Sequence, residues 1–368
     1  MSIKTLSMHH NAFFTPEQFA REQSQRMESA RGKLLIANCC SGRELAAKVR
    51  AQYTRLLVQA GSQDHILALE DIDYQFSDSE TCVRLEMHVG GYDVFLIQAL
   101  LNPVLKSSVD QNYLAFLIAA RTFRDHGARH VTAILPYLAY ARQDKPTKFM
   151  REPITAKLMA DLSKEAGIDR IVTWEPHSDQ LSGFYGSMPV DMLDSLAMFV
   201  KQFQHFQNRE DVIAVAPDAG ASKFITYFGR ALNLRSAIAS KFRPRQQEAI
   251  ITEVIGDFTG KRIAIVLDDM ISSGSTVYEL VKTLVREKGI EEIYLGAAHN
   301  LCQPSAGERL AELHKNYHLQ KVVITNSIPQ TEAFLKLPFV EVKCLSETLG
   351  RTINRIHYNR SVSELFAH

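Results

Sequence analysis

The chain has 368 residues, of which 46% are hydrophobic and 23% are charged, a composition typical of a globular protein long enough for two domains. Its 42 lysines and arginines nearly balance 41 aspartates and glutamates, so we expect no nucleic-acid partner. The five cysteines lack metal-site spacing, and no apolar run is long enough to cross a membrane. These properties predict a cytoplasmic protein with reduced thiols and no membrane partner.

Apolar runs of strand length alternate with helical patterns along most of the chain. In the first half the runs cover residues 34–37, 94–97, 131–135 and 170–173; in the second half they cover 212–215, 236–239, 263–267, 293–295 and 321–324. Runs that are apolar on both faces and separated by helices are typical of parallel sheets covered on both sides. We therefore predict an α/β fold of two similar domains, each a mainly parallel sheet flanked by helices.

The same pattern predicts the domain limits. Residues 1–32 form a polar leader to which we assign no chemistry. The first domain covers residues 33–188 and the second covers residues 189–345, with the break near residues 187–189. Residues 346–368 are predicted to pack back on the first domain.

Polar clusters follow several of these apolar runs, notably at residues 140–145, 174–177 and 217–223. Ligands of open parallel sheets bind beyond the carboxyl ends of the strands. Clusters at the same end of successive strands would therefore form one composite site.

The most informative stretch is residues 263–276, where an apolar run leads to Asp268 and Asp269. A loop of Ser272, Ser273, Gly274, Ser275 and Thr276 follows, and then a helical pattern begins. The free N–H groups and dipole of a helix N-terminus favour a phosphate, while the two carboxylates can accept hydrogen bonds from sugar hydroxyls. The alternative is a buried strand followed by a capped turn. Two adjacent carboxylates favour a sugar-phosphate site, because burying like charges is costly unless they are used.

Taken in order, these motifs resemble the ribose-phosphate pyrophosphokinases of the phosphoribosyltransferase superfamily. Residues 140–145, 153–158, 217–220 and 268–276 occur in that family's order and spacing, residues 326–330 are also similar, and the resemblance covers about residues 34–366. The family transfers the diphosphoryl group of ATP to the C1 hydroxyl of ribose 5-phosphate, giving phosphoribosyl pyrophosphate (PRPP) and AMP. The resemblance therefore implies two phosphoribosyltransferase-like domains, in-line attack on the β-phosphorus, and Mg²⁺ as the cofactor.

The resemblance also implies roles for residues of this chain. It makes Lys241 and Arg243 the catalytic pair, on a flexible loop after residues 236–239. It assigns ATP to Arg142, Gln143 and His177, and Mg²⁺ to His177 and Asp218. It assigns ribose 5-phosphate to Asp268, Asp269, Ser272, Ser273, Gly274, Ser275 and Thr276. Taken alone, a short basic loop is usually a solvated surface and a lone histidine is usually part of a core.

Phe76, Asp78 and Glu80 resemble the family loop that reaches the adenine site of a neighbouring subunit. This implies a homo-oligomer whose subunits share active sites. A β-turn with an exposed phenylalanine is the alternative interpretation. Phe242 stands where many relatives carry a basic residue, and residues 145–152 differ from the stretch tied to phosphate and nucleotide control. The sequence therefore leaves undecided which effectors control the protein and whether it forms the family's usual hexamer.

Two other functions remain as alternatives. A PRPP-consuming phosphoribosyltransferase would share the loop at residues 268–276, but it usually has a single domain of this type. A non-catalytic regulatory homologue should have lost either the catalytic pair or the metal-associated residues. Lys241, Arg243, His177 and Asp218 are all present, so the sequence favours an active enzyme.

Overall fold

The computed structural model describes residues 15–17, 27–245 and 248–365, and for residues 241–245 and 248–250 it describes the backbone alone. Most of the predicted leader lies outside the described residues. Met27 is already buried, and strand β1 (Glu28–Ser29) pairs with β2 (Gly32–Asn38), so the sheet begins before the predicted domain start at residue 33.

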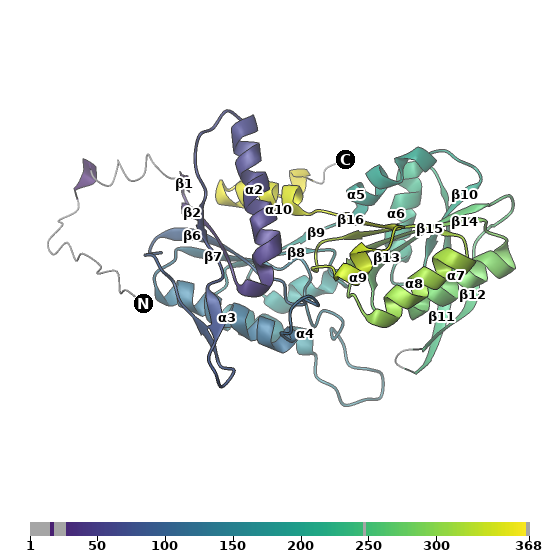
Figure 1. Ribbon diagram of the computed structural model, residues 1–368, viewed down its shortest axis with the longest axis horizontal. Helices are drawn as coiled ribbons and strands as arrows, with labels where there is room; N and C mark the ends of the chain where they lie inside the picture. Colours follow the sequence, from purple (N-terminus) through teal and green to yellow (C-terminus); the bar gives the residue numbers. More distant parts are fainter. Residues whose placement is uncertain (1–14, 18–26, 246–247, 366–368) are drawn as a thin grey trace.

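Two seven-stranded sheets form the two halves of the molecule (Figure 1). The first sheet has the order β1-β2-β6-β7-β8-β9, with β3 also paired to β2. Every pair in it except β1–β2 is parallel. The remaining strands of this sheet are β3 (Leu67–Leu69), β6 (Tyr92–Ile97), β7 (His130–Ile134), β8 (Arg170–Trp174) and β9 (Val190–Leu193).

The second sheet has the order β12-β11-β10-β13-β14-β15-β16, and only its edge pair β11–β12 is antiparallel among the described strands. Its strands are β10 (Val212–Ala216), β11 (Arg235–Arg245), β12 (Glu248–Ile255), β13 (Ile263–Ile271), β14 (Glu292–Asn300), β15 (Leu319–Thr325) and β16 (Val340–Lys343). A separate hairpin is formed by β4 (Asp73–Gln75) and β5 (Thr81–Val83). This architecture confirms the predicted α/β fold.

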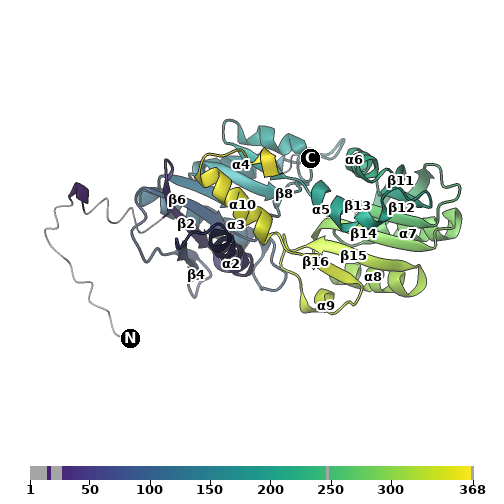
Figure 2. The same ribbon diagram turned by 90° about the horizontal axis from the view of Figure 1, so that it is seen from above.

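Helices cover both faces of each sheet (Figure 2). On the first sheet, α2 (Arg43–Gln59) and α10 (Ser346–His357) pack on one face, and α3 (Val109–Asp125) and α4 (Thr155–Glu165) pack on the other. On the second sheet, α5 (Leu196–Gln202) and α6 (Ser222–Leu232) lie opposite α7 (Ser275–Lys288) and α8 (Pro304–Asn316), and the short α9 (Glu332–Leu335) joins the α7–α8 side. Alternate residues of a strand face opposite ways, so neighbouring apolar residues of each central strand enter different cores.

The change from the first sheet to the second occurs later than the sequence predicted. Strand β9 lies beyond the predicted break at residues 187–189, but it pairs in parallel with β8 through Ile171 and Val190. The chain therefore leaves the first sheet after Leu193 and enters the second at Val212. The pairing of β9 with β8 sets this boundary. The sequence did not show it, because local composition changes little across it.

The C-terminal helix α10 lies against α2 of the first domain (Figure 2). Asn354 donates a hydrogen bond to the Tyr53 hydroxyl at 3.0 Å. Deeper in the interface, Nδ1 of His357 lies 2.8 Å from Oδ2 of Asp93, and both side chains are fully buried. Arg31 bonds the same carboxylate oxygen at 3.0 Å. A buried polar network thus ties the end of the chain to the first sheet.

Two strand limits differ from the sequence prediction. Strand β13 continues to Ile271, because β14 still pairs with it at Asp268 and Met270, so both carboxylates lie within the strand. Strand β11 continues through residues 241–243, where we expected a flexible loop, because β12 pairs with it there. Within the described residues, no helix combines the length and the apolar character that a membrane span requires.

Candidate functional site

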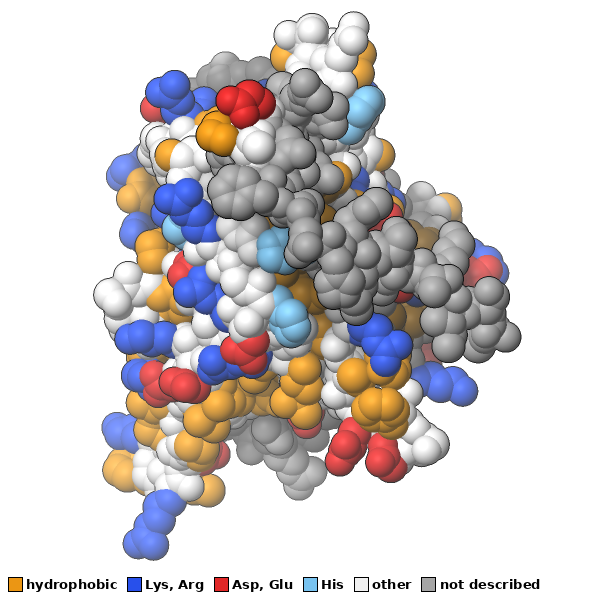
Figure 3. Space-filling model, turned by 90° about the vertical axis from the view of Figure 1, so that its left-hand side faces the viewer, with side chains coloured by type: hydrophobic (Ala, Val, Ile, Leu, Met, Phe, Trp, Pro, Cys, Tyr) orange, Lys and Arg blue, Asp and Glu red, His pale blue; other side chains and the backbone are white. Residues whose placement is uncertain are grey.

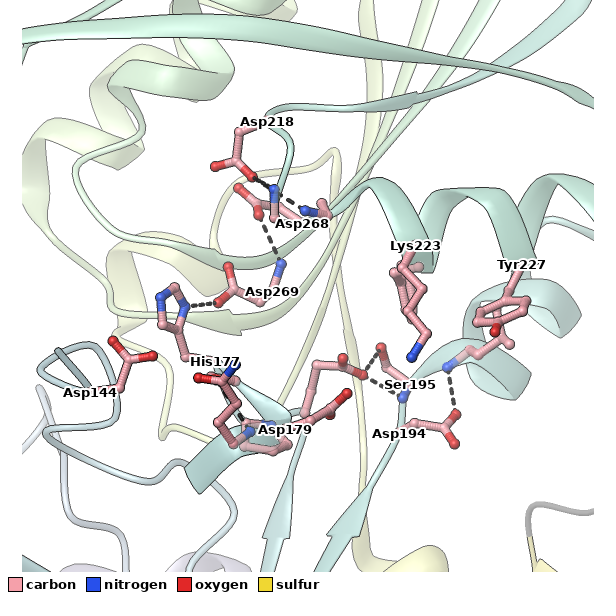
Figure 4. A pocket seen from close by; sticks show the side chains of 18 of the residues that line it. Asp144, His177, Asp179, Asp194, Ser195, Asp218, Lys223, Tyr227, Asp268 and Asp269 are labelled. Atoms are coloured by element: carbon pink, nitrogen blue, oxygen red, sulfur yellow. Dashed lines mark hydrogen bonds and ion pairs between the residues drawn. The ribbon is translucent and has the colours of Figure 1, made fainter. Parts of the chain in front are cut away.

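A pocket of about 800 Å³ lies between the carboxyl ends of the two sheets (Figure 4). The first domain contributes residues after β7, β8 and β9, and the second contributes residues after β10 and within β13. The lining includes Asp144, Lys145, Glu175, His177, Asp179, Asp194, Ser195, Asp218, Lys223, Tyr227, Asp268 and Asp269. The composite site expected from the polar clusters is therefore present.

His177 and Asp269 join the two domains across this pocket. Nδ1 of His177 lies 2.6 Å from Oδ2 of Asp269. This hydrogen bond raises the pKa of His177, and burial opposes it. Burial raises the pKa of Asp269, but the hydrogen bond and the charge of His177 outweigh that effect and lower it overall. The hydrogen bond therefore favours the charged forms of both side chains.

The other two pocket aspartates of the second domain are held by main-chain donors. Oδ1 of Asp218 accepts hydrogen bonds from the N–H groups of Gly220, at 2.8 Å, and Ala221, at 3.3 Å. Oδ1 of Asp268 accepts one from the N–H of Asp269 at 2.9 Å. Figure 4 shows these carboxylates gathered above His177. Main-chain N–H groups thus orient one oxygen of each carboxylate.

The predicted cation site can be compared with this set of donors. Among the described residues, no three histidine, cysteine or acidic side chains form a metal cluster. Mg²⁺ usually keeps several waters and binds one or two carboxylates together with substrate phosphates. Asp218, Asp268 and Asp269 offer carboxylate oxygens in one pocket, so the donor set fits a Mg²⁺ ion that binds together with a phosphorylated substrate.

Glu175 is a pocket residue whose importance the sequence did not reveal. Its carboxylate accepts hydrogen bonds from the N–H and hydroxyl of Ser195, at 2.7 and 2.6 Å. Its main-chain carbonyl is 3.0 Å from Nε2 of His299, a buried residue of β14 in the second domain. Burial raises its pKa to about 7. Its φ of +39° is unusual for a residue other than glycine. The sequence feature that could have identified Glu175 is an acidic residue directly after an apolar run.

The hydroxyl-rich loop lies directly after β13 and leads into α7, as the sequence indicated. Gly274 has φ +75° and precedes the first residue of the helix. The Ser273 hydroxyl donates to the Ser275 hydroxyl at 3.2 Å. Asp268 and Asp269 line the pocket, whereas residues 272–276 are outside its lining. The loop is therefore a neighbour of the pocket along the chain.

Other predicted residues lie outside this lining. Arg142 and Gln143 are exposed beside Asp144, and the charge of Arg142 opposes the rise in the pKa of His177. Phe76 is 50% exposed at the tip of the β4–β5 hairpin, where the N–H of Glu80 donates to Asp78. None of these residues lines the pocket of its own chain.

Lys241 and Arg243 have their backbone in β11, and their side chains are outside the part of the chain that is described. Sequence reasoning gave no role to Lys223 of α6, which points into the pocket (Figure 4). Its signal was its place at the end of the polar cluster at residues 217–223.

Two sheets that share an acidic pocket at their carboxyl ends, beside a hydroxyl-rich loop at a helix N-terminus, define a two-domain α/β protein with its candidate site between the domains. Residues 34–167 match the family model of the N-terminal domain of ribose phosphate pyrophosphokinase, and residues 233–367 match the model of the phosphoribosyl synthetase-associated domain.

Individual proteins are similar over most of the chain. The ribose-phosphate pyrophosphokinase of Caldanaerobacter subterraneus subsp. tengcongensis is 38% identical over 79% of this chain and 88% of its own length. That of Chromobacterium violaceum is 33% identical over 86% of this chain and 96% of its own. The crystal structure of phosphoribosylpyrophosphate synthetase from Mycobacterium smegmatis, 30% identical, covers 88% of this chain and 99% of its own with a TM-score of 0.74. The chain belongs to the ribose-phosphate pyrophosphokinase family, which confirms the predicted resemblance.

Proposed function

We propose that this protein transfers the diphosphoryl group of ATP to the C1 hydroxyl of ribose 5-phosphate, giving PRPP and AMP by in-line attack on the β-phosphorus. The observation that carries this proposal is the acidic interdomain pocket, which the bond between His177 and Asp269 spans and which adjoins the loop before α7. Two substrates have to meet in such a reaction, and a pocket built from two domains can hold one on each side. Family membership supports the same reaction.

Ribose 5-phosphate is assigned to the second domain. Asp268 and Asp269 would accept hydrogen bonds from the ribose hydroxyls, because both carboxylates line the pocket. Ser272, Ser273, Gly274, Ser275 and Thr276 would surround the 5-phosphate at the N-terminus of α7, where backbone N–H groups are available to an anion.

ATP is assigned to the side of the pocket formed by the first domain. Arg142 and Gln143 would bind the nucleotide, since they directly precede Asp144 of the pocket lining. His177 and Asp218 would hold Mg²⁺, which when bound neutralises charge on the triphosphate. His177 already keeps its ring oriented through Asp269. Asp218 is oriented by two N–H groups, so neither residue has to reorganise to receive the nucleotide.

Lys241 and Arg243 are proposed as the catalytic pair. They lie two residues apart in the chain, and their backbone is part of strand β11, next to β10, whose following loop carries Asp218 of the pocket. Positive charge near the β-phosphorus stabilises the transition state more than the bound substrates. Lys241→Ala should therefore reduce turnover by about three orders of magnitude while substrate binding changes much less. Equal losses in binding and turnover would contradict this role.

We also propose a homo-oligomer whose subunits share active sites. Phe76, Asp78 and Glu80 lie on a projecting hairpin and do not line their own pocket, which suits a contribution to a neighbour. Large apolar side chains are exposed on α3, on α4 and at the residue before α4, namely Leu114, Ile154, Leu158 and Leu162. Figure 3 shows hydrophobic side chains gathering on the lower half of the end formed by the first domain.

All five cysteines are unpaired, which fits a reducing cytoplasm.

The test is direct. Purified protein is incubated with ATP, Mg²⁺ and ribose 5-phosphate, and AMP and PRPP are separated by chromatography. Equal amounts of both products, formed only when the sugar phosphate is present, would support the proposal. Binding of ribose 5-phosphate without either product would favour the non-catalytic homologue. Consumption of added PRPP in the presence of a nucleobase would favour a phosphoribosyltransferase.

A further inference from the structure

The loop proposed to hold the 5-phosphate contains no cation. Its sequence is Ser-Ser-Gly-Ser-Thr at residues 272–276, and Asp268 and Asp269 precede it. A phosphate monoester carries about −1.5 to −2 charges near neutral pH. Helix α7 contributes roughly half a positive charge at its N-terminus. The nearby carboxylates oppose phosphate binding, so a cation close to the loop would change the affinity substantially.

Arg309 of α8 is the cation that contacts this loop. Its Nη1 donates a hydrogen bond to the main-chain carbonyl of Ser273. The side chain is partly buried. Within the described part of the chain, Arg309 has no carboxylate partner in an ion pair. Its positive charge therefore lies directly behind the loop.

The same hydrogen bond orients a main-chain donor. Peptide bonds of the described residues are trans, so the C=O of Ser273 and the N–H of Gly274 point in opposite directions. Because Arg309 holds the carbonyl toward α8, the N–H of Gly274 points away from α8. Arg309 thereby turns one N–H donor toward the open side of the loop, where an anion can accept it.

Helix α8 also supports the loop through packing. A Cβ added to Gly274 would lie 3.3 Å from Cα of Ala306, so the two backbones are in close contact. The Ser305 hydroxyl reaches the Ser273 carbonyl at 3.5 Å, and Nε2 of Gln303 lies 3.4 Å from the Ser272 hydroxyl. Arg309 therefore acts on a loop that α8 already holds in place.

We propose that Arg309 is a positioning residue for the 5-phosphate of ribose 5-phosphate. It fixes the Ser273–Gly274 peptide with an N–H facing the anion and adds positive charge behind it. The proposal rests on the assignment of this loop to the sugar phosphate.

The test measures binding of ribose 5-phosphate and of MgATP separately, by calorimetry, to the wild type, Arg309→Met, Arg309→Lys and Lys315→Met. Arg309→Met removes the charge and the donor, and it should weaken ribose 5-phosphate binding about tenfold or more while MgATP binding stays within about twofold. Arg309→Lys keeps the charge and should recover part of the loss. Lys315 is an exposed cation in the last turn of the same helix, and its variant should bind both ligands like the wild type.

Thermal melting checks the fold of each variant, and Arg309→Gln replaces Arg309→Met if the latter does not fold. Ribose 5-phosphate binding by the charge-removed variant within about twofold of the wild type would overturn the inference. An equal loss for both ligands would also overturn it, since that indicates general damage. If the wild type forms PRPP and the variant binds normally, this inference fails and the proposed function stands. If the wild type forms no PRPP but the variant loses sugar-phosphate binding, the proposed function fails and this inference stands.

Discussion

Replacing Gly274 by alanine tests whether the loop before α7 is held rigidly for substrate. A residue other than glycine in the left-handed region costs about 1–2 kcal/mol, and Gly274 has φ +75°. The new methyl group would also lie 3.3 Å from Cα of Ala306. Part of α8 or the loop then has to shift by a few tenths of an ångström, which adds roughly 1 kcal/mol.

Gly289, at the other end of the same helix, is a matched control. Its φ is +70°, and nothing lies within 4 Å of the position of a Cβ. Gly289→Ala should therefore lose about 1–2 kcal/mol from backbone conformation alone. Gly274→Ala should lose roughly 1 kcal/mol more and move the Ser273–Gly274 peptide. Because that peptide is assigned to the phosphate, the KM for ribose 5-phosphate should rise about tenfold in Gly274→Ala alone.

Urea unfolding followed by circular dichroism gives the two losses of stability. Steady-state formation of AMP, with ribose 5-phosphate varied at saturating MgATP, gives the KM. The reasoning is refuted if Gly274→Ala matches Gly289→Ala in stability and keeps the wild-type KM. A rise in the KM for ribose 5-phosphate in Gly289→Ala would equally contradict it.

Burial raises the pKa of Glu175 from 4.5 to about 7, so the folded state binds its proton more tightly than the unfolded chain does. The free energy of unfolding should therefore fall by at most about 3 kcal/mol as pH rises from 4.5 to about 7. Glu175→Gln should abolish this fall between urea unfolding curves at pH 5 and pH 8, and an unchanged pH dependence would contradict the prediction. Asp93→Ala removes the buried partner of His357 and should cost about 3–5 kcal/mol in urea unfolding; a loss below about 1 kcal/mol would mean that the pair is unimportant. His177→Ala should cost less than about 1 kcal/mol of stability, because its bond to Asp269 is partly exposed, but should raise the KM for MgATP about tenfold in the AMP assay; the reverse pattern would indicate a structural role.

The sequence predicted the features that depend on local pattern. Apolar runs marked the central strands, and the position of Asp268 and Asp269 after such a run marked one side of the pocket. The sequence did not predict that β13 continues past these carboxylates, because pairing with β14 decides that length. It also did not predict the environment of Glu175, which depends on Ser195 from the next strand connection. Contacts between distant segments leave no periodic signal in either segment.

Arg309 shows the same limit more sharply. Its carbonyl partner, Ser273, is 36 residues earlier in the chain. An arginine on an amphipathic helix is normally predicted to lie on the solvated surface. Only the packing of α8 behind the loop brings Arg309 into contact with it. The side chains of Lys241 and Arg243 lie outside the described residues, so their role stays a prediction.

The attachment of α10 to the first domain has a consequence for biosynthesis. His357 and Asp93 are 264 residues apart in the chain, so the core that α10 completes stays open until α10 itself has been synthesised. The second domain can assemble while the first still exposes the apolar surface of α2. Contacts of such long sequence separation form slowly, and domains otherwise fold in order during synthesis. The N-terminal domain, which is made first, is therefore the last to be completed.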